Sequence, residues 1–155
     1  MKNENYNITI NAEASAQDAV ESICNVAGWW TINLEGNTKN LNDVFTVRFG
    51  KTFVTFKITE FIPDKKISWL VTDSVVHSLQ DIKEWNDTKV LWDISEESGA
   101  AKITMTHVGL TPDVECYDMC KKGWNFYTGE SLKKLINEGK GLPDTPTQER
   151  KSVAV

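Results

Sequence analysis

Long apolar runs are missing from this 155-residue sequence, and none approaches the roughly 20 residues that a helix needs to cross a bilayer. Residues 1–11 contain no apolar core of the kind found in signal peptides. Basic residues are outnumbered: 17 Lys and Arg against 22 Asp and Glu give a net charge of −5. An acidic surface does not favour nucleic acid or anionic lipid as a partner. We therefore expect a cytoplasmic protein that binds neither nucleic acid nor membrane.

Cysteine is scarce, and the three present, Cys24, Cys116 and Cys120, are an odd number that cannot pair completely. Cys116 and Cys120 lie one helical turn apart, a spacing at which two thiolates can share a metal ion. Since further ligands are few, we expect both to be reduced core residues that bind no metal. Phosphate-binding loops, nucleophile elbows and calcium loops are also absent. We therefore expect no cofactor and assign no catalytic residue.

The composition that remains is that of a folded domain, with 40% hydrophobic and 25% charged residues. Residues 1–142 are expected to form a single domain, and the polar residues 143–155 a disordered tail. Ser15 can cap a helix over residues 16–24, and residues 26–32 favour a second short helix or a turn.

Alternation of polar and apolar residues predicts about six strands. They are expected over residues 6–12, 44–49, 52–62, 67–72, 88–95 and 101–108. Residues 35–42 are rich in Asn, Gly and Lys, which is typical of a loop. Residues 76–87 are expected to form a second, longer loop in which Leu79, Ile82 and Trp85 are single apolar anchors.

The longest predicted element is a helix over residues 111–141. Thr111 and Pro112 are typical of a helix start, and Gly139 is typical of a helix end. One broad face of this helix is apolar and aromatic, made of Cys116, Tyr117, Cys120, Trp124, Tyr127, Ser131, Leu132 and Leu135. The order of elements predicts an α+β fold: a curved antiparallel sheet of about six strands, two short helices, and one long C-terminal helix over the concave face.

Several stretches resemble the helix-grip (START or SRPBCC) superfamily, in the branch similar to the C-terminal domain of the activator of heat-shock protein 90 ATPase. They are TKVLWDIS at 88–95, THVGL at 106–110, CYDMC at 116–120, Trp124, Tyr127, SLKKL at 131–135 and GKGLP at 139–143. The resemblance extends over roughly Tyr6 to Pro143. It implies a helix-grip fold with an apolar cavity between the long helix and the sheet.

Within such a fold, the inward-facing residues are candidates to bind a hydrophobic small molecule. They are Trp30, Trp69, Trp92, His107, Trp124, Tyr127 and Ser131. The aromatic residues can equally well form a packed core, and His107 can be a buried structural residue or the polar group that orients a ligand. Ligand binding is the first hypothesis; the alternatives are a protein-interaction domain with a chaperone partner, and a cyclase- or hydrolase-type enzyme using the same cavity. We lean against the enzyme, because no nucleophile or orienting acid accompanies His107.

Met119 and Phe126 lie seven residues apart, away from the main apolar face of the long helix. They are covered by the loop over residues 76–87 or by the same helix of a second molecule, or they need no cover, since isolated exposed apolar residues are common. Of these, we expect the homodimer.

Overall fold

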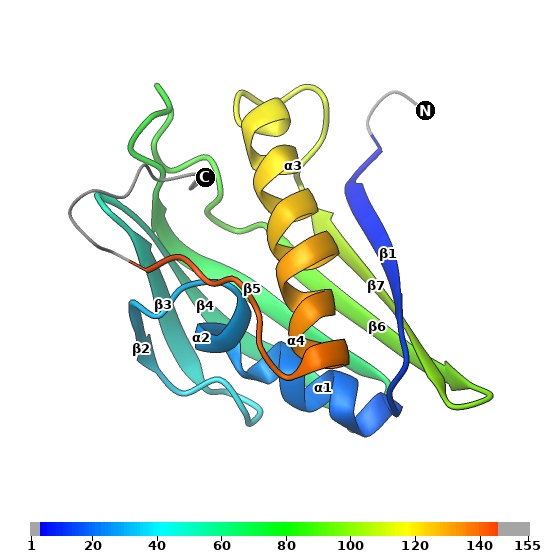
Figure 1. Ribbon diagram of the computed structural model, residues 1–155. Helices are drawn as coiled ribbons and strands as arrows, with labels where there is room; N and C mark the ends of the chain where they lie inside the picture. Colours follow the sequence, from blue (N-terminus) through cyan, green and yellow to red (C-terminus); the bar gives the residue numbers. More distant parts are fainter. Residues whose placement is uncertain (1–3, 146–155) are drawn as a thin grey trace.

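Alternating apolar residues form seven strands in the computed structural model, which describes residues 4–145. The strands are β1 (Tyr6–Ala12), β2 (Leu34–Gly36), β3 (Val44–Phe49), β4 (Thr52–Ile62), β5 (Lys66–Val75), β6 (Lys89–Glu97) and β7 (Ala100–Val108). They make one antiparallel sheet in the order β1-β7-β6-β5-β4-β3-β2. The helices lie on one face of this sheet (Figure 1). The predicted α+β arrangement is therefore confirmed.

Strand β2 was not predicted, because its three residues are too few to show alternation. It falls partly in the stretch expected to be a loop. Gly36 ends it with φ of +96°, and a Cβ atom there would collide with the backbone oxygen of Val44. Glycine therefore allows β2 to lie close against β3.

The apolar residues that alternate along the central strands are buried on one face, except Ile62 at the end of β4, which lies beyond the register shift between Ile58 and Glu60 and is 42% exposed. Phe45, Val47 and Phe49 of β3, Val54, Phe56 and Ile58 of β4, and Ile103, Met105 and His107 of β7 are all buried. Each set alternates with more exposed residues, as expected of a sheet with one face covered by helices.

Two short helices, α1 (Ala16–Cys24) and α2 (Val26–Trp29), follow β1. The predicted cap of α1 is present, since the Ser15 hydroxyl accepts a hydrogen bond from the backbone N–H of Asp18. The buried stripe of α1 turns toward the sheet and toward the end of the long C-terminal helix (Figure 1).

The C-terminal helix consists of α3 (Tyr117–Phe126), the π-helical segment η1 (Tyr127–Leu132) and α4 (Lys133–Glu138). It ends at Gly139, which has φ of +82°, and the predicted end is thus confirmed. The predicted start at Thr111 is wrong, because residues 111–116 form turns and the helix begins at Tyr117.

The physical reason for the late start lies in another part of the chain. The Glu84 carboxylate accepts the backbone N–H groups of Glu115 and Cys116, each at 2.9 Å. In return, the Glu115 carboxylate accepts the N–H groups of Gln80 and Asp81. An acid from the 76–88 loop therefore satisfies the helix start in place of the expected Thr111 cap.

The π-helical segment was also not predicted. It contains Gly129, where an added Cβ atom would lie 3.3 Å from Cδ1 of Ile8 on β1. A glycine in mid-helix normally lowers stability, and here it allows the helix to approach the edge strand closely.

The chain leaves α4 and turns back across α2 (Figure 1). Asp144 is buried; its N–H donates to the oxygen of Trp30, and its own oxygen accepts the N–H of Ile32. Asp144, within the stretch expected to be a disordered tail, is thus hydrogen-bonded to the domain; residues 146–155 of that stretch lie outside the described residues. No helix within residues 4–145 is both long and apolar enough to span a bilayer.

Candidate functional site

The structure brings all the residues predicted to bind a ligand into the layer between the C-terminal helix and the sheet. Trp30, Trp69, Trp92, His107, Trp124, Tyr127 and Ser131 are each exposed by 2% or less. Almost no surface is left on them that a water molecule could touch. Their side chains fill the space in which an open cavity was expected.

Trp30 is the centre of this packing. Its ring centroid lies 4.9 Å from that of Trp124, 5.5 Å from that of Trp29 and 6.5 Å from that of Trp69. Trp92 in turn lies edge-on to Trp29 and Trp69. Large rings contributed by α2, α3 and the sheet therefore interlock. The expectation of an open cavity under the helix is corrected to that of a packed aromatic cluster.

His107 is held in one tautomer by its neighbours. The indole Nε1–H of Trp124 donates to Nδ1 of His107 at 3.1 Å, and an indole N–H can only donate. The proton of the imidazole is therefore on Nε2, which lies 2.9 Å from the Thr88 hydroxyl. That hydroxyl donates onward to the backbone oxygen of Trp85 at 2.7 Å. Burial lowers the pKa of His107 to about 3, so the ring is neutral near pH 7.

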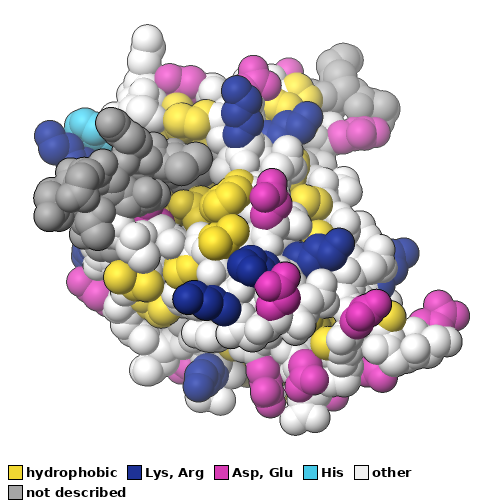
Figure 2. All heavy atoms as spheres, viewed as in Figure 1, with side chains coloured by type: hydrophobic (Ala, Val, Ile, Leu, Met, Phe, Trp, Pro, Cys, Tyr) yellow, Lys and Arg dark blue, Asp and Glu magenta, His cyan; other side chains and the backbone are white. Residues whose placement is uncertain are grey.

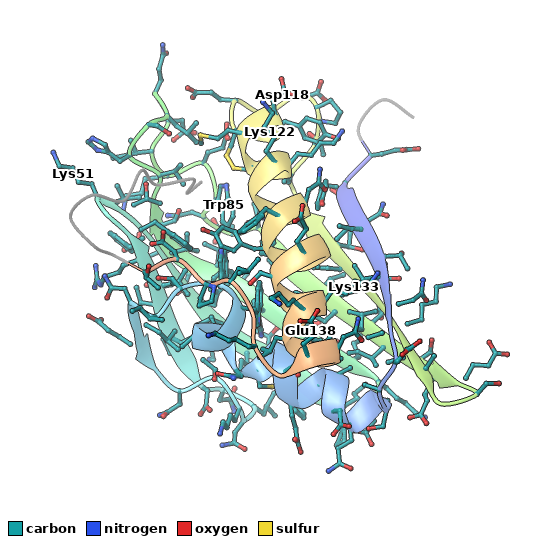
Figure 3. The ribbon with its side chains drawn as sticks, viewed as in Figure 1. Lys51, Trp85, Asp118, Lys122, Lys133 and Glu138 are labelled. Carbon is teal, nitrogen blue, oxygen red and sulfur yellow. A yellow bond between two sulfur atoms is a disulfide. The ribbon has the colours of Figure 1, made fainter. Side chains whose placement is uncertain are left out.

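Trp85 completes this cluster, although the sequence marked it only as a loop anchor. Its ring lies 4.5 Å from that of His107 and stacks on Trp124 at 6.1 Å. Its Nε1–H donates to Sγ of Cys120. The labelled side chain reaches from the 76–88 loop to the side of α3 (Figure 3). A tryptophan within an otherwise polar loop was the available signal.

Cys116 and Cys120 form a disulfide at the start of α3 (Figure 3). The expectation that both are reduced is therefore wrong. Their Cα atoms are 5.4 Å apart, within the usual range for a disulfide, because one helical turn separates them. The odd number of cysteines hid this pairing, since Cys24 is the one left free.

Ser131 joins α2 to the chain that follows α4. Its hydroxyl donates to the backbone oxygen of Trp29 and accepts the N–H of Leu142, both at 2.7 Å. Two other buried polar atoms of the layer, Nε1 of Trp92 and Oγ1 of Thr128, have no hydrogen-bond partner among the described residues. In the same part of the chain, no three His, Cys, Asp or Glu side chains gather as metal ligands would.

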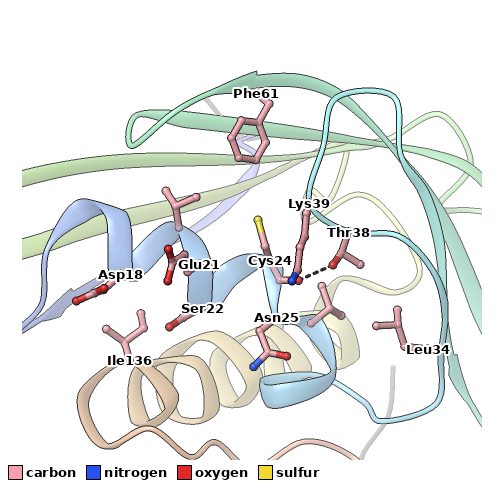
Figure 4. Close-up of a pocket in the computed structure, with 12 residues that line it drawn as sticks. Asp18, Glu21, Ser22, Cys24, Asn25, Leu34, Thr38, Lys39, Phe61 and Ile136 are labelled. Carbon is pink, nitrogen blue, oxygen red and sulfur yellow. Dashed lines mark hydrogen bonds between the residues drawn. The ribbon is translucent and has the colours of Figure 1, made fainter.

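A hollow of about 860 Å³ opens at the other end of the long helix. We call it the groove. It is lined by Asp18, Val20, Glu21, Ser22, Cys24, Asn25, Val26, Leu34, Thr38, Lys39, Phe61 and Ile136. Figure 4 shows α1 and α2 on one side and the chain around Thr38 on the other, with Lys39 extended toward Cys24.

The chemistry of the groove is mixed. The Thr38 hydroxyl donates to the backbone oxygen of Cys24 at 2.6 Å, which ties the loop to the end of α1. Burial raises the pKa of the Cys24 thiol to about 11; the nearby Lys39 charge opposes this shift and Glu21 adds to it. The thiol is therefore protonated and unreactive near neutral pH. The sequence did not indicate the groove, because its walls come from four separate segments and share no motif.

No family model matches the chain, and no curated protein matches it. Several solved structures are similar to the chain. The Aha1 dimer from Colwellia psychrerythraea is similar with a TM-score of 0.72 and 21% identity, over 88% of this chain and 98% of that one. DynU16, a putative protein in the dynemicin biosynthetic locus, is similar with a TM-score of 0.68 and 16% identity, over 89% of this chain and 49% of that one. CalU16 from Micromonospora echinospora is similar with a TM-score of 0.61 and 14% identity, over 85% of this chain and 74% of that one.

The fold is the helix-grip fold. These likenesses confirm the arrangement expected from the sequence, with the long helix laid across an antiparallel sheet. At such identities they show the fold alone. Within this helix-grip domain, one end of the helix–sheet layer is closed by aromatic rings and the other end opens into the groove.

Proposed function

We propose that this domain binds a small amphipathic molecule in the groove between α1, α2 and the chain around Thr38. The observation that carries the proposal is the hollow of about 860 Å³, which lies in the range of roughly 300–1,000 Å³ usual for small-molecule sites.

The lining of the groove suggests the kind of molecule. Leu34, Phe61 and Ile136 offer partly exposed apolar walls. Lys39 and Glu21 are exposed charged groups on opposite sides, and Lys39 extends across the opening (Figure 4). A ligand with an apolar body and an anionic group would place its body against the walls and its charge beside Lys39.

The predicted binding role of the aromatic residues stays a prediction. It requires the rings of Trp30, Trp69 and Trp124 to separate, because they are packed against one another here. The unpartnered polar atoms of Trp92 and Thr128 are what a polar group would meet inside such an opened layer. The proposed function is binding without catalysis, since both ring nitrogens of His107 already have hydrogen-bond partners.

Native mass spectrometry of freshly purified protein tests for a bound molecule directly. A defined probe is 8-anilinonaphthalene-1-sulfonate, an anionic amphipath, titrated while backbone amide signals are followed by NMR. We expect shifts confined to the lining of the groove, and at least tenfold weaker binding for Lys39→Glu. Lys51→Glu, in the β3–β4 turn away from the groove (Figure 3), is the matched control. Absence of any bound molecule, together with no shift in the groove, would reject the proposal.

A protein-interaction role with a chaperone partner is the second candidate. The closed aromatic cluster favours it, because an interaction domain needs no internal space. Stimulation of heat-shock protein 90 ATPase activity by the purified domain is the test, and an unchanged rate would reject this candidate. A homodimer is also proposed, since the similar structure from Colwellia psychrerythraea is named as a dimer. The cytoplasmic location expected from the sequence stays a prediction.

A further inference from the structure

Strand β1 leaves one side of its backbone unpaired by the sheet. It is the edge strand beside β7, and no other element borders it on the far side in Figure 1. The N–H of Tyr6 donates to the backbone oxygen of Leu110, which follows β7, so the N–H and C=O of Tyr6 lie on the β7 side of the strand. Successive residues of a strand alternate in this direction. The N–H and C=O groups of Asn7, Thr9 and Asn11 therefore point to the free side.

This edge carries none of the usual protection against pairing. Residues 6–12 include no charged side chain and no proline, and their register with β7 runs from Tyr6 opposite His107 to Ala12 opposite Ala101 without a bulge. Figure 2 shows the margin along β1 largely white, the colour of uncharged polar side chains and backbone. Edge strands with these properties are templates for another strand.

The opposite edge of the same sheet gives the contrast. Strand β2 has three residues, ends at Gly36 with a positive φ, and carries Glu35, which forms an ion pair with Arg48 at 3.3 Å. A short, charged edge of this kind resists pairing. The two edges of one sheet are therefore unequal, and only β1 among the described strands is a long uncharged edge.

We propose that β1 pairs antiparallel with β1 of a second copy of this chain. A two-fold axis through Thr9 places it opposite the partner's Thr9, and places Asn7 opposite the partner's Asn11. The three outward residues then exchange main-chain hydrogen bonds as donors and as acceptors, and their uncharged side chains lie face to face without repulsion. The half-buried Ile8 gains the partner's Ile10 as a neighbour on the concave side.

A second copy is the occupant that this edge fits best, because the sequence around Thr9 is complementary to itself under two-fold symmetry. The alternative face expected from the sequence, at Met119 and Phe126, is already half-buried within the chain, and Met119 contacts the Ser78 side chain. One strand edge is smaller than the roughly 1,600 Å² of a standard interface, so the dimer is expected to be weak, with a micromolar Kd.

The inference rests on the homodimer proposed above and is independent of the groove. Sedimentation equilibrium of the full chain, from low to several hundred micromolar, tests it with two variants. Thr9→Lys brings two positive charges together at the axis and should raise the dimer Kd at least about tenfold. Thr72→Lys, the same change at an exposed site on the central strand β5, should leave the Kd unchanged. Near-ultraviolet circular dichroism checks that both variants keep the aromatic cluster.

Amide hydrogen exchange of the unaltered protein provides a measurement without substitution. Protection of the Thr9 amide should rise with protein concentration, whereas the Lys51 amide in the β3–β4 turn should not change. A wild-type monomer throughout the range overturns both the homodimer and this pairing. A dimer that is equally strong in Thr9→Lys, with no concentration-dependent protection at Thr9, overturns the β1 pairing and leaves the homodimer standing.

Discussion

The two ends of the helix–sheet layer differ in how completely the chain fills them. Beside α3, the rings of Trp85 and Trp124 and the imidazole of His107 leave no gap, and the 76–88 loop is hydrogen-bonded to the start of the helix. At the end of α4, the walls around Lys39 and Phe61 stay apart and form the groove. The same helix therefore closes one end and leaves the other open.

The difference shows that a helix-grip fold does not by itself make an internal cavity. What decides is the size of the side chains pointing inward: tryptophans at the closed end, and smaller or half-exposed residues at the groove. Along its outer face, the helix carries interspersed lysines and acids, such as Lys122, Asp118, Lys133 and Glu138 (Figures 2 and 3). This face gives neither end a strong electrostatic preference.

The largest expected effect is that of Trp124→Ala at the closed end. The side chain is 2% exposed and packs against Trp30, so its loss should lower the free energy of unfolding by about 3–5 kcal/mol. Phe61→Ala in the groove wall, where the ring is half-exposed, should lower it by about 1 kcal/mol. Urea melts of the two variants measure this. Equal losses of unfolding free energy in the two variants would contradict the difference in packing between the aromatic cluster and the groove.

Acid should weaken the closed end through His107. Its pKa falls from 6.5 to about 3 on folding, so the unfolded chain takes up a proton between these pH values and the folded chain does not. Stability is therefore lost as pH falls from 6.5 toward 3, by at most about 1.4 kcal/mol per pH unit from this residue. Urea melts at several pH values give the free energy of unfolding as a function of pH. Between pH 6.5 and 3, this free energy should fall less steeply for His107→Gln than for the exposed-site control His77→Gln. An unchanged slope would contradict a neutral, buried imidazole.

Removing the charge of Glu84 should weaken the contact between the 76–88 loop and the start of α3. Glu84→Gln keeps the shape of the side chain but weakens its hydrogen bonds to the N–H groups of Glu115 and Cys116. We expect a loss of about 1 kcal/mol in the free energy of unfolding and faster exchange of those two amides. Glu97→Gln, at the exposed end of β6, is the matched control and should have neither effect.

The smallest effect on stability is expected in the groove. Lys39 is exposed, and its side chain forms no ion pair within residues 4–145. Lys39→Glu should therefore change the free energy of unfolding by less than about 0.5 kcal/mol. A thermal melt checks this. A large loss would mean that Lys39 supports the fold, and would undermine its use as a probe of ligand binding.

Features with local causes could be predicted from the sequence. Alternation identified the buried face of β7 and that of β4 as far as Ile58, Ser15 identified the start of α1, and Gly139 identified the end of the long helix. The inward position of Trp124 also follows from helical spacing. Each of these signals lies within a few residues of the structure that it predicts.

Features that depend on distant residues could not be predicted. The start of α3 is set by Glu84, about thirty residues upstream of Cys116. The groove combines residues of α1, β4 and α4 that no spacing connects. Whether the aromatic residues pack or line a space depends on how the rings of Trp30 and Trp124 meet, which their positions in the sequence do not reveal.

The π-helical segment has a consequence for how this chain tolerates changes in length. Bonds from residue i to i+5 enclose one more residue than an α-helical turn. In an ordinary helix, one inserted residue would swing all later side chains by about 100° around the axis. Here the surplus is contained within Tyr127–Leu132, so α3 and α4 each keep their own face on the domain. Deletion of one residue within Tyr127–Leu132 is therefore expected to return this segment to α-helical geometry while α3 and α4 keep their faces on the domain.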